Sequence, residues 1–461
     1  MIFRIRRLRA AAAPCFAVLA LVFIAGCDTS RTGDELQDTR GPTPQRAPAA
    51  APDAAALLRA AGPIDLLGEQ AIQPYAAGGQ AETTGAATAD AGAGDAQRIG
   101  LLLPLSGTFA YLGRPMLNAA QLAVFDAAGE QFELMVFDTA GDPDQASEAA
   151  RMAIDQGARL IIGPLLADST RAAAPWAQAA GVPMLSFSSD RTVAGNGVFI
   201  LGFAPRDQVE RVVEYASARG IGDFAVIAPE DAYGALVAEA VQDAAARVGG
   251  RVSDVRFLSR DLSGASIALQ AVGASPAPVV SPEVSPAVSP GISPGVSPGI
   301  SPGNADRALL IAEGGERLRF VADLLEGDGA APGQVQILGT GTWDEPWISS
   351  EPVLVGGWFA APPPWSREPF VQNYARTYGE DPPRLAGLAY DATALAAIVS
   401  RIIGGMELTA DVLTTPAGFI GSEGIFRFAS SGVSERGLAV LEVTPQGVNV
   451  ISDAPQSFVG I

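Results

Sequence analysis

Short, continuously apolar runs alternate with amphipathic stretches from Arg98 onward, and this alternation constrains the fold more than any other feature. The runs include "IGLLLP", "FELMVFD", "ARLIIGP", "DFAVIAP" and "ALLIAE", and stretches such as "RDQVERVVEYASARG" between them have helical periodicity. Strands that are apolar throughout and followed by helices are typical of parallel sheets covered on both faces. The chain contains more pairs of strand and helix than one sheet can hold. The pattern therefore predicts an α/β fold with two Rossmann-like lobes.

The lobe boundaries follow from the order of these units. We assign residues 98–204 to lobe 1, 205–339 to lobe 2 and 340–430 to a return into lobe 1, and we expect the strands of 431–461 in lobe 2. A Ser-Pro repeat at 275–303 interrupts lobe 2, and proline at this density favours an extended, polyproline-like segment. It is either a docking arm for another protein or an expanded surface loop, and we favour the loop.

The N-terminal residues have the layout of a secretory signal. Residues 1–26 join an arginine-rich head to an apolar run that ends in Ala-Gly, directly before Cys27. The run is shorter than the ~20 residues that a membrane-spanning helix needs. The arrangement resembles a bacterial lipobox, which implies cleavage before Cys27 and acylation of its thiol and amino group. In enteric bacteria Asp28, the next residue, would resemble a signal for the inner membrane.

The segment that follows the cysteine differs from the rest of the chain. Residues 27–97 are rich in Ala, Pro, Gly and Thr and lack the apolar periodicity of a core. Such a composition is typical of disorder. We therefore expect a long, flexible tether that holds the folded part away from the membrane.

The composition excludes many kinds of chemistry. The chain has no histidine and no lysine, and the predicted processing removes Cys15 and acylates Cys27. Common zinc, copper and haem sites, serine and cysteine nucleophiles paired with histidine, and lysine nucleophiles therefore lack their residues. We expect no enzyme activity, no metal and no cofactor. The formal net charge of −20 also argues against nucleic acid as a partner.

Ligands of open parallel sheets bind outside the carboxyl ends of the strands. The loops at these ends are rich in small polar residues, which suit a small polar solute. A serine or threonine at the start of a helix is, however, more often only an N-cap. The candidate cleft residues of these loops are Ser106, Gly107, Tyr111, Ser169, Thr170, Ser188, Ser189, Asp190, Arg191, Tyr233 and Glu313.

Several segments resemble, in order, the type I periplasmic solute-binding proteins of the leucine/isoleucine/valine-binding kind. They are "IGLLLPLSGTFAYLGRPMLNAAQLAV", "FDTAGDPDQASEAARMAIDQGARLIIGPLLADST", "GVPMLSFSS" and "EDAYGALVAEAV". The resemblance implies two lobes joined by three hinge crossings, with a ligand cleft between them and no enzyme activity. Two branches of the family fit. One consists of receptors for ABC importers of amino acids or similar solutes, and the other of lipoproteins that activate penicillin-binding proteins, the peptidoglycan synthases.

The residues that hold an amino acid in the receptors are only partly matched. Ala167 stands where they use a hydroxyl for the carboxylate, and Asp190 stands where they have a threonine. Gly341 stands where the receptors have an acid that pairs with the ligand's ammonium group. Asp344 follows three residues later and is the last of our candidate cleft residues. Asp190 and Arg191 could take over the two charged groups of a zwitterion.

These departures, the long tether and the Ser-Pro repeat favour the activator over the importer receptor, which stays the alternative. We therefore expect a lipid-anchored protein in the periplasm of a Gram-negative bacterium, attached to the inner or outer membrane. Its expected partner is a penicillin-binding protein, or in the alternative an ABC permease and a small polar solute.

Overall fold

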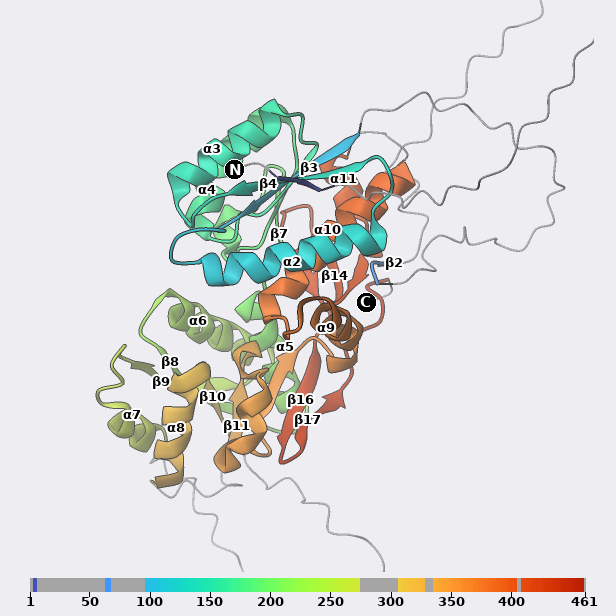
Figure 1. Cartoon of the computed structure of the whole chain (residues 1–461). Helices are drawn as coiled ribbons and strands as arrows, with labels where there is room; N and C mark the ends of the chain where they lie inside the picture. Colours follow the sequence, from blue (N-terminus) through green and yellow to red (C-terminus); the bar gives the residue numbers. More distant parts are fainter. Residues whose placement is uncertain are drawn as a thin grey trace, which may run out of the picture.

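The computed structural model describes residues 3–5, 63–67, 96–273, 306–327, 335–403 and 408–459. Cys27, most of the predicted tether and the Ser-Pro repeat at 275–303 lie outside these residues. Figure 1 shows two lobes, with α2 (Ala110–Ala127) lying along the side of lobe 1 that faces lobe 2. The predicted α/β fold with two Rossmann-like lobes is confirmed.

Lobe 1 is built on a sheet whose strands follow the order β1-β4-β3-β5-β6-β7. All neighbouring pairs are parallel except β1 with β4. Alternate side chains of β3 and β4 enter two apolar clusters, one under α2 and α10 and the other under α3 and α4. The elements are β1 (Phe3–Ile5), β3 (Gln97–Leu103), β4 (Phe132–Asp138), β5 (Leu160–Ile162), β6 (Met184–Ser186), β7 (Val198–Ile200), α3 (Pro143–Asp155), α4 (Ala167–Ala180) and α10 (Arg384–Ile403).

Lobe 2 contains a sheet with the order β17-β16-β12-β11-β10-β8-β9. The strands from β9 to β12 are parallel, whereas β16 and β17 are antiparallel additions beside β12. Helices α5 and α6 cover one face, and α7 and α8 cover the other. The elements are α5 (Pro205–Ser217), β8 (Asp223–Pro229), α6 (Ala232–Arg247), β9 (Arg251–Leu258), α7 (Ala265–Gly273), β10 (Arg307–Ile311), α8 (Gly315–Gly327), β11 (Gln336–Gly339), β12 (Trp358–Ala361), β16 (Ala439–Thr444) and β17 (Gly447–Ser452).

A third, four-stranded sheet packs against the core of lobe 1 and has the strand order β15-β14-β13-β2. Its strands are β2 (Ile64–Asp65), β13 (Phe419–Gly421), β14 (Gly424–Phe428) and β15 (Ser434–Arg436). The remaining helices, α9 (Pro364–Tyr378) and α11 (Ala410–Leu413), precede this sheet, and they pack with lobe 1.

Three sequence expectations differ from the structure. The predicted tether is not disordered throughout, because Ile64 and Leu66 are buried in the core of lobe 1 and β2 pairs with β13. The chain returns to lobe 1 after Ala361 rather than at 340, because β12 pairs with β11 and β16 in the sheet of lobe 2. The strand β15 within 431–461 joins the third sheet, whereas β16 and β17 lie in lobe 2 as expected.

The strand β1 falls within the predicted signal. It pairs antiparallel with β4 through Phe3 and Val136, Arg4 and Met135, and Ile5 and Leu134. Cleavage before Cys27 would remove β1 and leave β4 at the edge of the sheet.

One described helix, α10, is long and apolar enough to cross a membrane. The window that meets this test is 89% buried, and the helix packs against α2 in the core of lobe 1. Its apolar character therefore reflects a central position in the fold.

The chain crosses between the lobes three times, after β7, after β12 and between β15 and β16, as predicted. Arg436 of the third crossing donates hydrogen bonds to the carbonyl oxygens of Leu201 in the first crossing, at 2.8 Å, and of Glu423, at 3.2 Å. Ser366, just after the second crossing, donates to the carbonyl oxygen of Ser422 at 3.2 Å. Side-chain hydrogen bonds therefore tie the crossings together.

A pair of fully buried carboxylates lies beside these crossings. Asp391 accepts hydrogen bonds from the backbone N–H groups of Ser422, at 2.7 Å, and Glu423, at 3.2 Å. Burial, and then the neighbouring charge of Glu423, raise the pKa of Asp391 from 3.8 to about 7. A β-carbon on Gly421 would lie 2.5 Å from this carboxylate, which explains the glycine.

We expect Leu66→Ala to lower the free energy of unfolding by about 2–4 kcal/mol, because it removes a buried side chain from the core. The measurement is urea unfolding of the full chain. Leu67→Ala is the matched control and should cost less, because Leu67 is only partly buried against the same core. Equal, small effects of the two changes would contradict the docking of this segment.

We expect the free energy of unfolding to fall as the pH rises from about 4 to about 7. The raised pKa means that folded Asp391 keeps a proton which the unfolded chain has already lost above its ordinary value of 3.8. Burial also raises the pKa of Asp207, to about 6, with the same sign. Each carboxyl contributes at most about 1.4 kcal/mol per pH unit. No histidine in the chain competes in this range.

The variant Asp391→Asn should remove part of this slope in urea unfolding measured at each pH. The exposed Asp381→Asn is the control and should leave the slope as it is. A full slope retained in Asp391→Asn would show that Asp391 does not titrate in this range.

Candidate functional site

The first two loops of the predicted cleft in lobe 1 are joined by Asp138, at the end of β4. Its carboxylate accepts hydrogen bonds from the backbone N–H groups of Leu105 at 2.9 Å, Ser106 at 3.2 Å and Ala140 at 2.8 Å. Partial burial acts against these hydrogen bonds, but the net effect holds the pKa of Asp138 below its ordinary value. Ser106 and Gly107 are exposed at the tip of this fixed loop.

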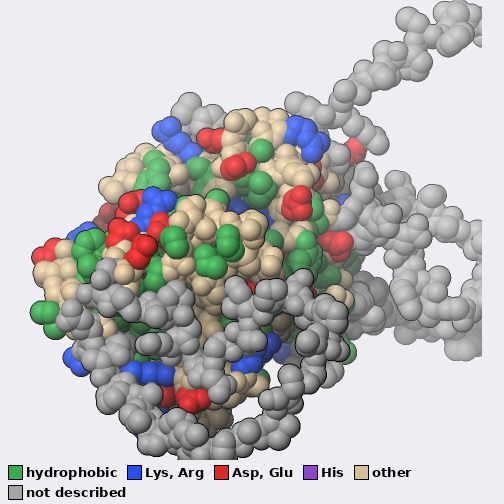
Figure 2. Space-filling model, turned by 90° about the horizontal axis from the view of Figure 1, so that it is seen from below, with side chains coloured by type: hydrophobic (Ala, Val, Ile, Leu, Met, Phe, Trp, Pro, Cys, Tyr) green, Lys and Arg blue, Asp and Glu red, His purple; other side chains and the backbone are tan. Residues whose placement is uncertain are grey.

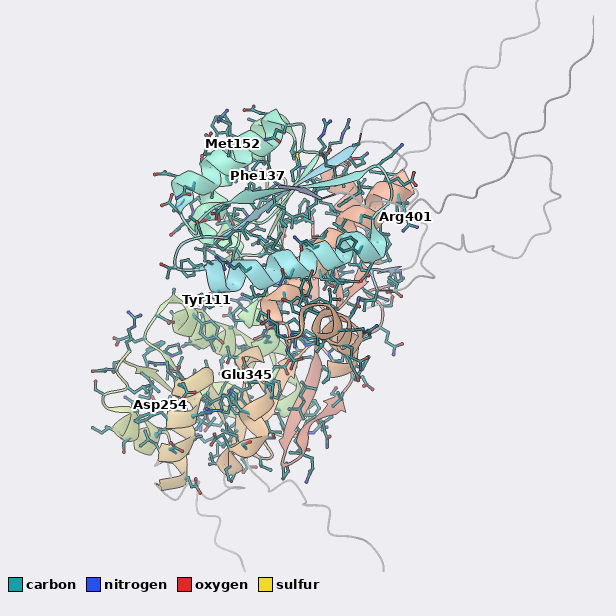
Figure 3. All side chains as sticks on the ribbon, viewed as in Figure 1. Tyr111, Phe137, Met152, Asp254, Glu345 and Arg401 are labelled. Atoms are coloured by element: carbon teal, nitrogen blue, oxygen red, sulfur yellow. The ribbon has the colours of Figure 1, made fainter. Side chains whose placement is uncertain are left out.

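Gly107 has a structural reason for its identity. Its φ is +73°, and a β-carbon there would lie 2.7 Å from the carbonyl oxygen of Ala140. Tyr111 follows on α2 and is 68% exposed. It lies at the amino end of this helix, on the side of lobe 1 that faces lobe 2 (Figure 3).

The first turn of α4 carries two buried hydroxyl groups. The Thr170 hydroxyl lies 2.7 Å from the Ser186 hydroxyl and donates to the carbonyl oxygen of Leu166 at 2.9 Å. The Oγ of Ser169 is buried and has no hydrogen-bond partner. The N-cap residue is Leu166, which has no side-chain oxygen, so Ser169 and Thr170 do not act as the predicted N-caps.

The loop after β6 uses its polar groups locally. Asp190 accepts hydrogen bonds from the backbone N–H of Thr192 at 2.9 Å and from its hydroxyl at 2.7 Å, and its carboxylate lies 3.5 Å from Arg171. The Ser188 hydroxyl accepts a hydrogen bond from the N–H of Asp190 at 3.1 Å. Ser189 and Arg191 are exposed, and Arg191 begins the short helix η1 (Arg191–Val193).

The candidates of lobe 2 also have partners within the protein. The Tyr233 hydroxyl lies 2.8 Å from that of Thr340, and burial raises the pKa of Tyr233. Glu313 is buried and forms a two-pronged ion pair with Arg317, with both distances at 2.7 Å. These groups form a connected cluster at the carboxyl ends of β8, β10 and β11.

Asp344 pairs with a residue of the other lobe. It follows the short helix η2 (Gly341–Trp343) after β11, and its carboxylate forms an ion pair with Arg384 at the start of α10 in lobe 1. Arg384 is not among the residues predicted from the sequence, because it follows two prolines and belongs to no recognisable motif.

The three acidic candidates, Asp190, Glu313 and Asp344, thus all have arginine partners. Their role in binding a solute stays a prediction. Two cavities of the described residues lie elsewhere. One, of about 450 Å³, lies between α6 and β9, and another, of about 360 Å³, lies where β3 and β4 begin and α10 ends. Within the described part of the chain, acidic residues do not gather into a group suited to a metal ion.

Known proteins match this chain in both sequence and fold. Residues 96–415 match the model of a family described as periplasmic binding protein. Among curated proteins, a penicillin-binding protein activator LpoA from Haemophilus ducreyi is 29% identical over 167 residues, 36% of this chain and 27% of that protein. The LpoA of Glaesserella parasuis is 28% identical over 164 residues, 35% of this chain and 27% of that protein.

Other curated matches are also partial. An uncharacterized protein from Rickettsia prowazekii is 21% identical over 159 residues, 34% of this chain and 42% of that protein. The chain therefore matches less than half the length of these curated relatives.

Solved structures share the fold along most of the chain. The leucine-binding protein LivK from Thermotoga maritima is 20% identical with a TM-score of 0.53, covering 77% of this chain and 98% of that one. A putative branched-chain amino acid ABC transporter protein from Rhodospirillum rubrum is 20% identical with a TM-score of 0.59, covering 77% and 100%. At this identity the likeness shows the fold alone. Together with the family match, it shows that the chain belongs to the periplasmic binding protein family.

Proposed function

We propose that this chain is a lipid-anchored, non-catalytic envelope protein that activates a penicillin-binding protein. One observation carries the proposal. The acidic candidates of the predicted cleft, Asp190, Glu313 and Asp344, are already paired with arginines of the same protein. An amino acid that displaced Arg317 or Arg384 would leave a largely buried charge unpaired. The pair of Asp190 with Arg171 is exposed, so separating it costs little. A protein partner needs no such displacement.

The composition supports a role in binding rather than catalysis. The absence of histidine and lysine leaves carboxylates as the main ionisable groups for chemistry. Two carboxylates beside the crossings, Asp391 and Glu423, are fully buried and therefore do not meet a substrate. The family is one of binding proteins.

The relatives favour the synthase as partner. Two of the curated matches are named penicillin-binding protein activators, and each covers about a third of this chain. The family implies a periplasmic or envelope location, and acylation of Cys27 would anchor the chain there. On the face drawn in Figure 2, acidic and basic side chains of the described residues occur in small mixed groups. Such a surface fits a folded protein better than nucleic acid.

In this mechanism the two lobes act as a docking body. Binding to one conformation of the synthase in preference to another shifts the population towards the favoured conformation. The protein then changes the rate of peptidoglycan synthesis without taking part in the reaction.

We expect the full acylated chain to bind a bifunctional peptidoglycan synthase and to raise its rate of synthesis. The measurement combines surface-immobilised binding with an assay of glycan polymerisation and peptide cross-linking. A leucine-binding receptor of the same fold is the control and should have no effect. Unchanged synthase rates and no binding would contradict the proposal.

One observation favours the alternative, a receptor for an ABC importer. Ser169 presents a buried hydroxyl without a partner in the first turn of α4. A helix amino end is a favourable place for an anion, and this hydroxyl could donate to a solute carboxylate. Solved neighbours of this fold include a solute-binding protein from Rhodopseudomonas palustris in complex with benzoate and a LivJ from Streptococcus pneumoniae in complex with isoleucine.

If the proposed function is correct, thermal unfolding of the chain should not respond to amino acids or small organic acids at millimolar concentration. A receptor would instead gain about 2.7 kcal/mol at a solute concentration of 100 times Kd, a clear shift of the midpoint. In that case Ser169→Ala should weaken binding by about 1 kcal/mol, roughly fivefold in Kd. The exposed Ser350→Ala is the control. A solute-specific shift would favour the receptor over the activator.

A further inference from the structure

The ion pair between Arg384 and Asp344 joins the two lobes directly. Arg384 belongs to α10, which packs in the core of lobe 1, and Asp344 follows β11 of the lobe 2 sheet. The two residues are 40 positions apart in the chain, and each is held by its own lobe. In a hinged binding protein, a solute usually provides such a link when the lobes close on it.

Lobe 1 holds the guanidinium of Arg384 in place. Its Nε lies 3.2 Å from Oε2 of the fully buried Glu423, and its guanidinium carbon lies 5.3 Å from the ring centre of Phe203. The other oxygen of Glu423 lies 3.2 Å from Nε of Arg367, which also donates to the carbonyl oxygen of Pro382 at 2.8 Å. Contacts within lobe 1 therefore hold the guanidinium of Arg384 independently of Asp344.

Lobe 2 fixes Asp344 in a similar way. The preceding residue, Trp343, is fully buried and donates its indole N–H to the carbonyl oxygen of Ile311 at 3.2 Å. A β-carbon on Gly339 would lie 2.2 Å from the indole ring, so the glycine makes room for it. The N–H of Gly341 donates to the side-chain oxygen of Gln208 at 2.8 Å. The loop that carries Asp344 is thus anchored to the sheet and to α5.

The surroundings strengthen this pair compared with an ion pair on the surface. The side chains of Arg384 and Asp344 are 22% and 23% exposed, so water and salt screen their attraction less. Both groups are already ordered, so forming the pair costs little further conformational entropy. The pair also spans the lobes directly, so it resists rotation of one lobe against the other.

We propose that the Arg384–Asp344 ion pair holds the two lobes in one relative orientation without any solute. The pair takes the place of a bound ligand as the link between the lobes. The consequence for a protein partner rests on the proposed function, because a fixed orientation presents one constant docking surface. The ion pair itself does not depend on that function.

The test measures the distance between the lobes. The full chain in a Cys15→Ser, Cys27→Ser background has no other thiols, so spin labels can be placed at Gln145→Cys and Gln242→Cys. These exposed positions lie on α3 and α6, one on each lobe. Double electron–electron resonance spectroscopy should give a narrow distribution of distances between the two spin labels in the parent chain. The variant Asp344→Asn should shift and broaden the distribution towards longer distances.

Glu345→Gln is the matched control, because it makes the same chemical change at the exposed neighbouring residue. Arg384→Lys is a second variant, since a single ammonium group cannot reach both Glu423 and Asp344 through separate nitrogens, and it should broaden the distribution as well. Thermal unfolding checks that each variant is folded. Distributions of Asp344→Asn and Arg384→Lys that match Glu345→Gln would overturn the proposal. The measurement uses neither synthase nor solute, so its failure is distinct from failure of the proposed function.

Discussion

A buried carboxylate, that of Glu423, organises the arginines beside the crossings. Arg367 and Arg384 each lie 3.2 Å from one of its oxygens, and Arg436 donates to its backbone carbonyl oxygen. A charge in the protein interior is tolerated only when it is paired and hydrogen-bonded, so these arginines cannot move far from Glu423. Arg436 in turn binds the carbonyl oxygen of Leu201, and this brings the first and third crossings together. The carboxylate of Glu423 thus holds Arg367 and Arg384, while Arg436 links the crossings through backbone carbonyl oxygens.

The ion pairs of Glu423 continue into the predicted cleft. Arg384 serves Glu423 in lobe 1 and Asp344 in lobe 2, so the hinge and the cleft share one electrostatic network. In a solute receptor, charged groups of the cleft stay available for the ligand until it binds. Here the acidic groups are engaged by Arg171, Arg317 and Arg384. The chain has the fold of the periplasmic binding protein family, and the acidic candidates of its predicted cleft pair with its own arginines.

The periodicity of the sequence was sufficient to predict the two lobes, because each apolar run is a buried strand and each amphipathic stretch covers a sheet face. Periodicity could not predict very short strands or contacts between residues far apart in the sequence. Ile64 and Leu66 lie in a stretch rich in alanine and proline, and a strand of two residues has no period to detect. Of the site, the strand-end rule indicated Glu313 and the family resemblance indicated Asp344, but neither indicated their partners. Arg384 is a single arginine whose role depends on Asp344 and Glu423, each about 40 residues away, so no local signal identifies it.

All basic residues of the chain are arginines, and one arginine can form ion pairs with two acidic side chains. The chain has 30 arginines against 50 acidic residues, so one-to-one pairing leaves many acids without a partner. A guanidinium group offers five N–H donors in a fixed plane and can contact two carboxylates through different nitrogens, whereas a lysine ammonium acts as a point charge. Arg206 contacts Glu239 and Asp243 through separate nitrogens, and Arg384 does the same for Asp344 and Glu423. Arg151, Arg171 and Arg319 also bridge two acids each, so one guanidinium can organise two carboxylates at several places in the described structure. Placing one such bridging arginine between the lobes favours a fixed arrangement of the lobes over an open cleft that waits for a solute.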